Sequence, residues 1–443
     1  MQDSGLHGKY SVACNVATGA HSSLLIREGG LMIILENARV FDGHSAECAE
    51  GVSIAIEGQI IREVSEKPLS FPEAQRINVG GRTLMPGLID LHTHAYASDM
   101  NVKRVDGAGD PYRTAHAVRM LGHALDSGFT TLRDIGGGDW SLSEALKDGL
   151  LRGPRFFYAG KILSMTGGHG DFRGPGEAHH THGYCSCGGD ANTLCVVVDG
   201  VDACLRAVRE QYRRGAHCIK IMGSGGVASP TDPIWINQFR EDEIRAVVNE
   251  CMERRSYAAA HCHPPSAIRR CVDFGVRCIE HGTLIDDETA AFVAERGAYI
   301  VPTMAIIFAI RESGAALGMP KDSVDKLNEM FDEALAGMDR MRSAGVKIGF
   351  GTDLLGEAYI QQTREFLLRS EVFSPLEILR QATSMSAEIL MKSDQLGSVK
   401  VGAFADLIVV DGDPLSDIGL LAQSGERLSL IMRDGEIVKN LLN

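Results

Sequence analysis

Residues 87–94 read GLIDLHTH, an apolar run that ends in two histidines separated by one residue. The run predicts a buried β-strand, in which side chains at positions i and i+2 point to the same face. The Cβ atoms of His92 and His94 then lie roughly 6–7 Å apart, so both imidazoles can reach one metal ion. The segment therefore predicts two metal ligands at the end of a strand, and further ligands must come from elsewhere in the chain.

The composition is that of a large globular protein. The 443 residues, 44% of them hydrophobic, allow one large domain with a smaller one, or two to three average domains. A net charge of -14 argues against a nucleic-acid partner and an anionic membrane surface. Eleven scattered cysteines do not form a disulfide scaffold, and they favour a cytoplasmic location. Residues 1–31 show no signal peptide and predict a loosely ordered N-terminal extension.

Two flanking segments are rich in short strands. Residues 32–86 contain apolar or alternating runs broken by Gly, Asp and Asn, and residues 397–443 repeat this pattern. We expect the two segments to pair as one small β-sandwich built from both ends of the chain.

The middle of the chain, residues 87–396, alternates short apolar strands with helical patterns. In residues 201–216, for example, Val201, Leu205 and Val208 fall on one face of a helix. With GLIDLHTH, eight strands alternate with helices, which predicts an α/β protein with a (β/α)8 barrel. An open doubly wound sheet is the alternative, but no phosphate-binding glycine motif opens a helix here.

Six residues with metal-binding or acid–base chemistry fall at the carboxyl ends of the predicted strands, where barrels carry their chemistry. A buried histidine, a lysine or a capping aspartate each has a structural explanation when it occurs alone. Six at one end of the strands predict a metal centre. They are His92, His94, Lys220, His261, His281 and Asp353.

Lys220 is the unusual member of this set, because an ammonium group has only donors and cannot bind a cation. Burial at a strand end lowers the pKa of a lysine. The neutral amine can then react with carbon dioxide to give a carbamate, whose two oxygens could bridge two metals.

These motifs resemble those of the amidohydrolase superfamily in its binuclear, carboxylated-lysine form. The resemblance rests on PGLIDLHTH (86–94), the strand-end lysine, two later strand-end histidines and GTD (351–353). TGGHGD (166–171), IKIMGSGGV (219–227) and AAHCH (259–263) resemble the prolidase-like branch. That branch contains metal-dependent dipeptidases and carboxypeptidases, and the ochratoxin-hydrolysing amidases are similar. The resemblance covers residues 32–443.

The resemblance implies two divalent metal ions, for which histidine and carboxylate ligands favour zinc. One ion is held by His92, His94 and Asp353, and the other by His261 and His281. An N6-carboxylysine at Lys220 and a hydroxide bridge them. Asp353 and Lys220 are the implied catalytic residues: Asp353 takes the proton of the attacking hydroxide and passes it to the leaving amine. A homo-oligomer, with an octamer as one form, is also implied.

Five further residues are candidates for substrate binding. In the resembling branch a histidine at the position of His169 contacts the substrate, and a loop histidine bonded to backbone is the alternative. His263 lies on the same strand face as the metal ligand two residues before it, although some prolidase-like relatives carry tyrosine there. Tyr96 and Ser98 follow the histidine pair. Arg173, with His169 and the backbone of GSGG (223–226), could attract a substrate carboxylate.

Two other features suggest roles near the predicted barrel mouth. Residues 177–190 contain three histidines, but Cys185 and Cys187 are closer together than in structural zinc sites, so we expect a mobile loop. Met304, Phe308 and Met319 could form an apolar wall for substrate, and core packing is the preferred interpretation.

The leading functional hypothesis is hydrolysis of a small-molecule amide, a dipeptide or an N-acyl amino acid, with release of an amino acid. A mononuclear deaminase or imidazolonepropionase-like hydrolase is the first alternative. Those sites generally lack the bridging lysine, and the stretch HCHPPS (261–266) lacks the acidic residue that deaminases carry. A catalytically silent scaffold is the second alternative, although the chain keeps all six ligands. Two, one or zero ions per chain separate the three hypotheses.

Overall fold

The computed structural model describes residues 32–174, 176, 193–229, 232–316 and 318–442. The predicted extension at residues 1–31 and the predicted loop at residues 177–190 lie outside these ranges, so both stay predictions. The described chain is a mixed α/β structure with three sheets. No helix of the described ranges is both long and apolar enough to cross a membrane.

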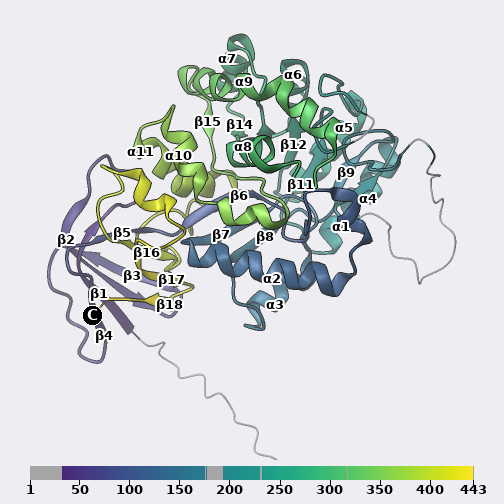
Figure 1. Ribbon diagram of the computed structural model, residues 1–443. Helices are drawn as coiled ribbons and strands as arrows, with labels where there is room; N and C mark the ends of the chain where they lie inside the picture. Colours follow the sequence, from purple (N-terminus) through teal and green to yellow (C-terminus); the bar gives the residue numbers. More distant parts are fainter. Residues whose placement is uncertain (1–31, 175, 177–192, 230–231, 317, 443) are drawn as a thin grey trace, which may run out of the picture.

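Strands from both ends of the sequence form one eight-stranded sheet, whose purple and yellow strands lie side by side in Figure 1. The order is β18-β17-β16-β5-β1-β2-β3, and β4 also pairs with β1. The two ends meet where β5 and β16 run antiparallel, with Pro86 opposite Leu407. The sandwich packing and the domain boundaries stay predictions. The strands are β1 (Met32–Val40), β2 (Ala49–Glu57), β3 (Ile60–Ser65), β4 (Gln75–Asn78), β5 (Thr83–Pro86), β16 (Leu407–Val410), β17 (Leu428–Arg433) and β18 (Glu436–Asn440).

The middle of the chain forms two parallel sheets. One has the order β6-β7-β8, and the other has the order β10-β9-β11-β12-β13-β14-β15. Their strands are short and nearly all buried, as expected for parallel strands covered on both faces. They are β6 (Leu88–Thr93), β7 (Phe129–Asp134), β8 (Arg155–Tyr158), β9 (Ile162–Ser164), β10 (Cys195–Val197), β11 (Ile219–Met222), β12 (Ala258–Cys262), β13 (Cys278–His281), β14 (Tyr299–Val301) and β15 (Lys347–Ile348).

Backbone hydrogen bonds connect the two parallel sheets. The N–H of Leu91 in β6 donates to the carbonyl of Phe350, just after β15, at 2.8 Å. At the other side, the N–H of His217, before β11, donates to the carbonyl of Tyr158 in β8 at 2.8 Å. The segment after β15 therefore runs beside β6, and the segment before β11 lies beside β8.

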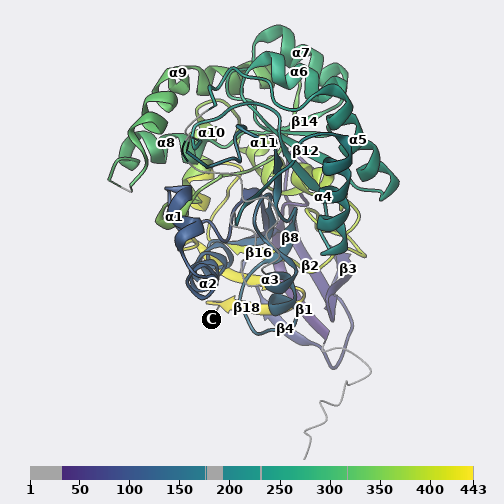
Figure 2. The ribbon, with the colours of Figure 1, turned by 90° about the vertical axis from the view of Figure 1, so that its right-hand side faces the viewer.

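Helices flank the parallel strands, as Figures 1 and 2 show. In α4 the buried side chains include Cys204, Ala207 and Val208, whereas Val201 and Leu205 are only half-buried, so the packed face is rotated from the predicted one. The helices are α1 (Val102–Gly107), α2 (Asp110–Asp126), α3 (Trp140–Lys147), α4 (Val201–Arg213), α5 (Glu241–Glu253), α6 (Pro265–Asp273), α7 (Asp287–Glu295), α8 (Met304–Ser313), α9 (Lys321–Ser343), α10 (Arg364–Ser370), α11 (Pro375–Arg380) and α12 (Ser386–Ile389). Shorter 3₁₀ or π turns span Gly356–Gln361, Gln381–Met385 and Ile418–Ala422.

The run RFFYAGKIL (155–163) is one of the eight strands predicted from the sequence, and in the structure it is divided into two. Gly160 adopts a left-handed backbone conformation, with φ of 73°, and separates β8 from β9. A side chain at this position would also meet the amide oxygen of Gln211 at 2.3 Å. The sequence pattern did not predict this break, because the apolar residues on both sides of the glycine read as one run.

The run VKIGFGTD (346–353) is another of the eight strands predicted from the sequence. In the structure only Lys347 and Ile348 have strand geometry. The chain nevertheless continues along β6. A Cβ atom at Gly351 would lie 2.9 Å from the Cβ of His92, so glycine permits this close approach. The last predicted ligand, Asp353, is thereby brought beside the first.

A buried ion pair connects α10 to the last parallel strands. Arg369 donates to Glu365 at 2.8 Å, and both side chains are fully buried. The same guanidinium also donates to the carbonyls of Gly349 and Pro302, at 3.0 and 2.8 Å, and to Gln381 at 2.6 Å. The arginine therefore satisfies carbonyls that follow β14 and β15.

We expect Arg369→Leu to lower the free energy of unfolding by about 3–5 kcal/mol, because it leaves the Glu365 carboxylate buried without its partner. Urea denaturation followed by circular dichroism measures the change. The control is Arg152→Leu, in an exposed pair with Asp126, which should change stability by no more than about 0.5 kcal/mol. Equal stability of the two variants would contradict a structural role for Arg369.

Candidate metal centre

Two histidines and an aspartate from separate strand ends lie close together. Ligand atoms of His92, His281 and Asp353 all lie within 4.8 Å of one another. The N–H of Asp353 donates to the carbonyl of His92 at 2.8 Å, which fixes the carboxylate beside the imidazole. His281 and Asp353 have φ values of 72° and 56°. Such left-handed conformations are uncommon outside glycine and are found at functional sites.

The imidazole rings are oriented through one nitrogen, which leaves the other for a ligand. A ring nitrogen that donates to the protein carries the hydrogen, so the second nitrogen keeps its lone pair. The Nε2 atoms of His92 and His94 point to the same oxygen of Asp353, at 3.4 and 3.3 Å. The partners of Nδ1, each at 2.8 Å, are Glu280 for His92, the Gly136 carbonyl for His94 and Thr303 for His281.

His261 extends the cluster away from the histidine pair. Its ring centroid lies 4.5 Å from that of His281 and 4.6 Å from that of His263. Burial lowers the pKa of His261 and His281 well below the ordinary value, so both rings are neutral, the form that binds metals. The residues present therefore fit a site for divalent ions.

The pKa values of the histidine pair differ. Burial lowers the pKa of His92 to about 4. Burial also acts on His94, but the adjacent Asp353 carboxylate outweighs it and raises the pKa of His94.

Lys220 is buried in β11, with a side chain that is 1% exposed. Burial lowers its pKa, and the nearby carboxylates of Glu280 and Asp353 only partly oppose this effect. An amine with a lowered pKa is more often neutral, which is the form that attacks the carbon of carbon dioxide. The structure thus places Lys220 in the surroundings that its predicted modification requires.

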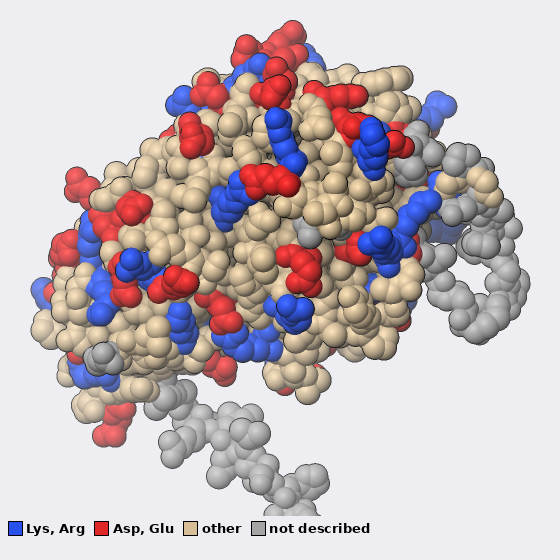
Figure 3. Space-filling model, in the orientation of Figure 1, with Lys and Arg blue, Asp and Glu red and all other residues tan. Residues whose placement is uncertain are grey.

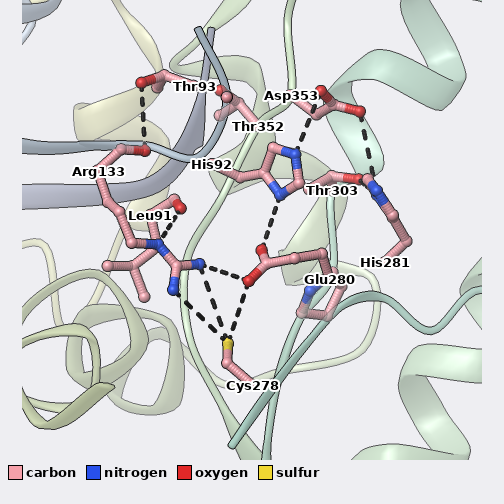
Figure 4. A network of polar contacts seen from close by, with 12 residues as sticks. Leu91, His92, Thr93, Arg133, Cys278, Glu280, His281, Thr303, Thr352 and Asp353 are labelled. Atoms are coloured by element: carbon pink, nitrogen blue, oxygen red, sulfur yellow. Dashed lines mark hydrogen bonds and ion pairs between the residues drawn. The ribbon is translucent and has the colours of Figure 1, made fainter. Parts of the chain in front are cut away.

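Glu280 and Arg133 belong to the centre but are absent from the sequence-based set. Glu280 accepts from His92 at 2.8 Å through one oxygen and from Arg133 at 2.7 Å through the other (Figure 4). Burial alone would raise the pKa of Glu280, but Arg133 and His92 hold it well below the ordinary value. The sequence does contain a signal for these two residues. Both are charged residues inside apolar strands, where a buried charge requires a partner.

Two more buried aspartates hold the ligand segments in place. Asp90 accepts from the N–H of His92 at 3.0 Å and from the Thr352 hydroxyl at 2.7 Å, so it ties β6 to the segment before Asp353. Asp134 accepts from the N–H of Ala95 at 2.6 Å. Burial raises the pKa of Asp90 and Asp134 to about 6.

Two of the predicted substrate-binding residues lie against the histidine cluster. The ring of His169 stacks on that of His261 with centroids 4.3 Å apart, and its Nδ1 lies 2.8 Å from the Ser229 hydroxyl. His263 lies 5.1 Å from His281 between ring centroids. Burial lowers the pKa of His263 to about 3.

The other three candidates have different partners. Tyr96 is half-buried and donates to Asp139 at 3.2 Å. Ser98 is half-buried, and its N–H donates to the carbonyl of Tyr96 at 2.9 Å. Arg173 forms a two-point ion pair with Asp171 at 2.6 and 2.5 Å, so part of its charge is already neutralised. Their contact with substrate stays a prediction.

Histidines and a carboxylate held at the ends of parallel strands are donor types that metal-assisted hydrolases use. Residues 83–438 match the Amidohydrolase family, and the chain therefore belongs to that family. This confirms the family predicted from the sequence motifs, and the relatives described next confirm its branch.

The relatives include peptidases and an amidase. Ochratoxinase from Aspergillus niger is 32% identical over 365 residues, which cover 80% of this chain and 75% of that protein. A prolidase structure complexed with N-methylphosphonate-L-proline is 44% identical, with a TM-score of 0.89 over 92% of this chain and 100% of that chain. A Xaa-Pro dipeptidase structure with methionine bound in the active site is 30% identical, with a TM-score of 0.81 and the same coverage.

We expect Glu280→Gln to lower metal affinity about 10–100-fold, because the amide no longer orients His92 as a charged acceptor. Competition with a chromophoric chelator measures the affinity. The control is Glu241→Gln on the exposed start of α5, which should bind metal like the wild type. Wild-type metal affinity in the Glu280 variant would show that the charge of Glu280 is not needed to orient His92.

Proposed function

We propose that the protein is a binuclear metal-dependent hydrolase that cleaves the amide bond of a dipeptide or an N-acyl amino acid and releases the amino acid. The observation that carries the proposal is the convergence of His92, His94 and His281 on the Asp353 carboxylate. The printed names of the relatives, prolidase, Xaa-Pro dipeptidase and ochratoxinase, support an amide substrate.

The proposed scaffold is a closed (β/α)8 barrel. Its support is the pair of hydrogen-bonded connections between the two parallel sheets, one beside β6 and one beside β8. The similar prolidase structure agrees over nearly the whole described chain. Ring closure would put every candidate ligand at one rim, where the chemistry of such barrels is found.

The proposed centre holds two divalent ions, with zinc favoured by the ligand types. When bound, such ions polarise a carbonyl group and lower the pKa of water. The buried amine of Lys220 supports an N6-carboxylysine bridge, because a charged ammonium would repel both ions. In the proposed assignment, His92, His94 and Asp353 hold one ion, His261 and His281 hold the other, and Lys220 bridges them.

Asp353 is proposed to move the proton. Burial alone would raise its pKa, but His92 and His94 keep the pKa of Asp353 below the ordinary value, so the carboxylate is ionised and able to accept a proton. Its second oxygen lies 4.0 Å from Nδ1 of His281, on the side away from the histidine pair. The carboxylate is thus positioned to accept a proton from water and to deliver it to the leaving amine.

A cavity with five apolar lining residues supports a substrate with a hydrophobic substituent. The cavity, of about 100 Å³, is lined by Met100, Val102, Phe172, Ala228 and Met319, and also by polar residues that include Lys103 and Asp322. Phe172 and Ala228 follow His169 and the GSGG segment closely in sequence, which supports a position near the proposed substrate histidine. Met319 and Met304 are both buried in the main core, and Phe308 packs against that core, as core packing predicts.

The remaining properties are proposed from charge and family. Acidic and basic side chains are interspersed on the face shown in Figure 3, which suits a small-molecule partner better than a nucleic acid. We also propose a cytoplasmic homo-oligomer. Nothing in the geometry favours the deaminase or the silent scaffold, and the number of bound ions separates them from the present proposal.

We expect Lys220→Ala to bind fewer than two ions and to lose activity on N-acyl amino acids, because no second group replaces the bridge. Elemental analysis of the purified protein gives the metal content. Short carboxylic acids should restore part of the turnover. The control is Lys400→Ala, at an exposed position. Two ions with full activity in Lys220→Ala would exclude Lys220 as the bridge.

A free α-carboxylate on the substrate should be required for efficient cleavage. Loss of one charge-assisted hydrogen bond predicts a roughly ten- to hundredfold lower kcat/KM for the amide than for the acid. His169→Ala should reduce this preference while metal content is unchanged, because His169 contacts a ligand but is not itself in the ligand set. The exposed His44→Ala is the control. Equal cleavage of acid and amide by the wild type would leave only a general amidohydrolase.

A further inference from the structure

A second cavity, of about 170 Å³, lies at the opposite end of the parallel strands from the metal centre. Cys218 and Tyr257 line it, and they are the residues directly before β11 and β12. The candidate metal ligands lie at the carboxyl ends of the same strands. The cavity is therefore separate from the rim where substrate is proposed to bind.

The lining of this cavity is basic. It includes Arg133, Arg255, Lys392 and His217, and none of the described residues that line it is acidic. This is unexpected in a chain with a net charge of -14. Among the described residues, no carboxylate forms an ion pair with Arg255 or Lys392. Two cations thus border the cavity without a protein counter-charge.

His217 adds an uncharged donor. Its Nδ1 accepts from the N–H of Tyr158 at 3.2 Å, so the ring hydrogen is on Nε2. Burial, with smaller contributions from the cations of Lys147 and Lys392, lowers the pKa of His217 to about 4. The ring can therefore donate a hydrogen bond at neutral pH.

The backbone around the cavity is strained at two of its lining residues. Arg255 and Met391 have φ values of 53° and 58°, and they follow the ends of α5 and α12. Glycine is the usual residue at such positions. Arginine at position 255 therefore keeps a cation at the cavity despite an unfavourable backbone conformation. The alternative role of the cations is to balance the carbonyl ends of these helices.

The cavity is connected to the metal centre through Arg133. This guanidinium borders the cavity, donates to Tyr257 at 3.1 Å and pairs with Glu280, which accepts from His92. An anion beside Arg133 would compete with Glu280 for its donors. The negative charge of Glu280 would then act more strongly on His92.

We propose that this cavity binds a small oxyanion of the size of phosphate between Arg255, Lys392 and His217, and that its binding changes the metal centre through Arg133 and Glu280. The binding site stands independently of the reaction. Only the second part rests on the proposed function, because its readout is the hydrolase activity.

Calorimetric titration of the metal-loaded protein with phosphate, and separately with sulfate, at constant ionic strength tests the binding site. We expect saturable binding, weakened at least tenfold by the double substitution Arg255→Gly and Lys392→Gln. Glycine relieves the left-handed backbone at position 255, so the melting temperature should stay near that of the wild type. A matched control, Lys321→Gln with Arg342→Gln in α9, removes the same charge elsewhere and should bind like the wild type.

Absence of binding, or equal binding by the wild type and the cavity variant, would overturn the site. If the wild type and the cavity variant bind phosphate equally, phosphate binds at the metals or at another site and not in this cavity. The coupling is tested by kcat/KM with and without phosphate: the wild type should change at least twofold, and the cavity variant should not respond. A bound oxyanion without effect on kcat/KM would overturn the coupling alone. If the metal-loaded wild type has no hydrolase activity with or without phosphate, the proposed function is rejected instead.

Discussion

The Glu280 carboxylate lies between the permanent cation of Arg133 and the imidazole of His92, a candidate metal ligand, and its side chain is fully buried. An unpaired carboxylate in this position would be strongly destabilising, so Arg133 is required before Glu280 can orient His92. The orientation of His92 in turn decides whether its Nε2 faces Asp353. The geometry of the candidate centre therefore depends on one ion pair that touches neither substrate nor metal.

The same arrangement explains how the centre can gather four histidines and a lysine without an accumulation of positive charge. Burial keeps the rings of His261 and His281 neutral and lowers the pKa of Lys220. Glu280 is paired with the cation of Arg133, and the ionised Asp353 raises the pKa of the adjacent His94. Neutral imidazoles beside a carboxylate attract divalent cations, whereas the same imidazoles in water would be partly protonated.

The family and its branch were identified by the resemblance of motifs such as PGLIDLHTH, and the strand period predicted that His92 and His94 share one face. Sequence reasoning also found the alternation of strands and helices. It missed the break at Gly160, since a left-handed glycine is not visible in an apolar run. It missed the Arg133–Glu280 pair: a charge inside an apolar strand indicates that a partner exists, but the two residues are on different strands and no local pattern relates them.

The pairing of β5 with β16 has a consequence for biosynthesis. The eight-stranded sheet needs strands from both ends of the sequence, so it cannot be completed until the ribosome has made residues 407–440. Until then β5 has no partner on the side that later pairs with β16, and such an apolar edge, unsaturated in hydrogen bonds, promotes aggregation of nascent chains. Chaperone dependence during translation should therefore concentrate on the N-terminal strands, even though the proposed chemistry is confined to the middle of the protein.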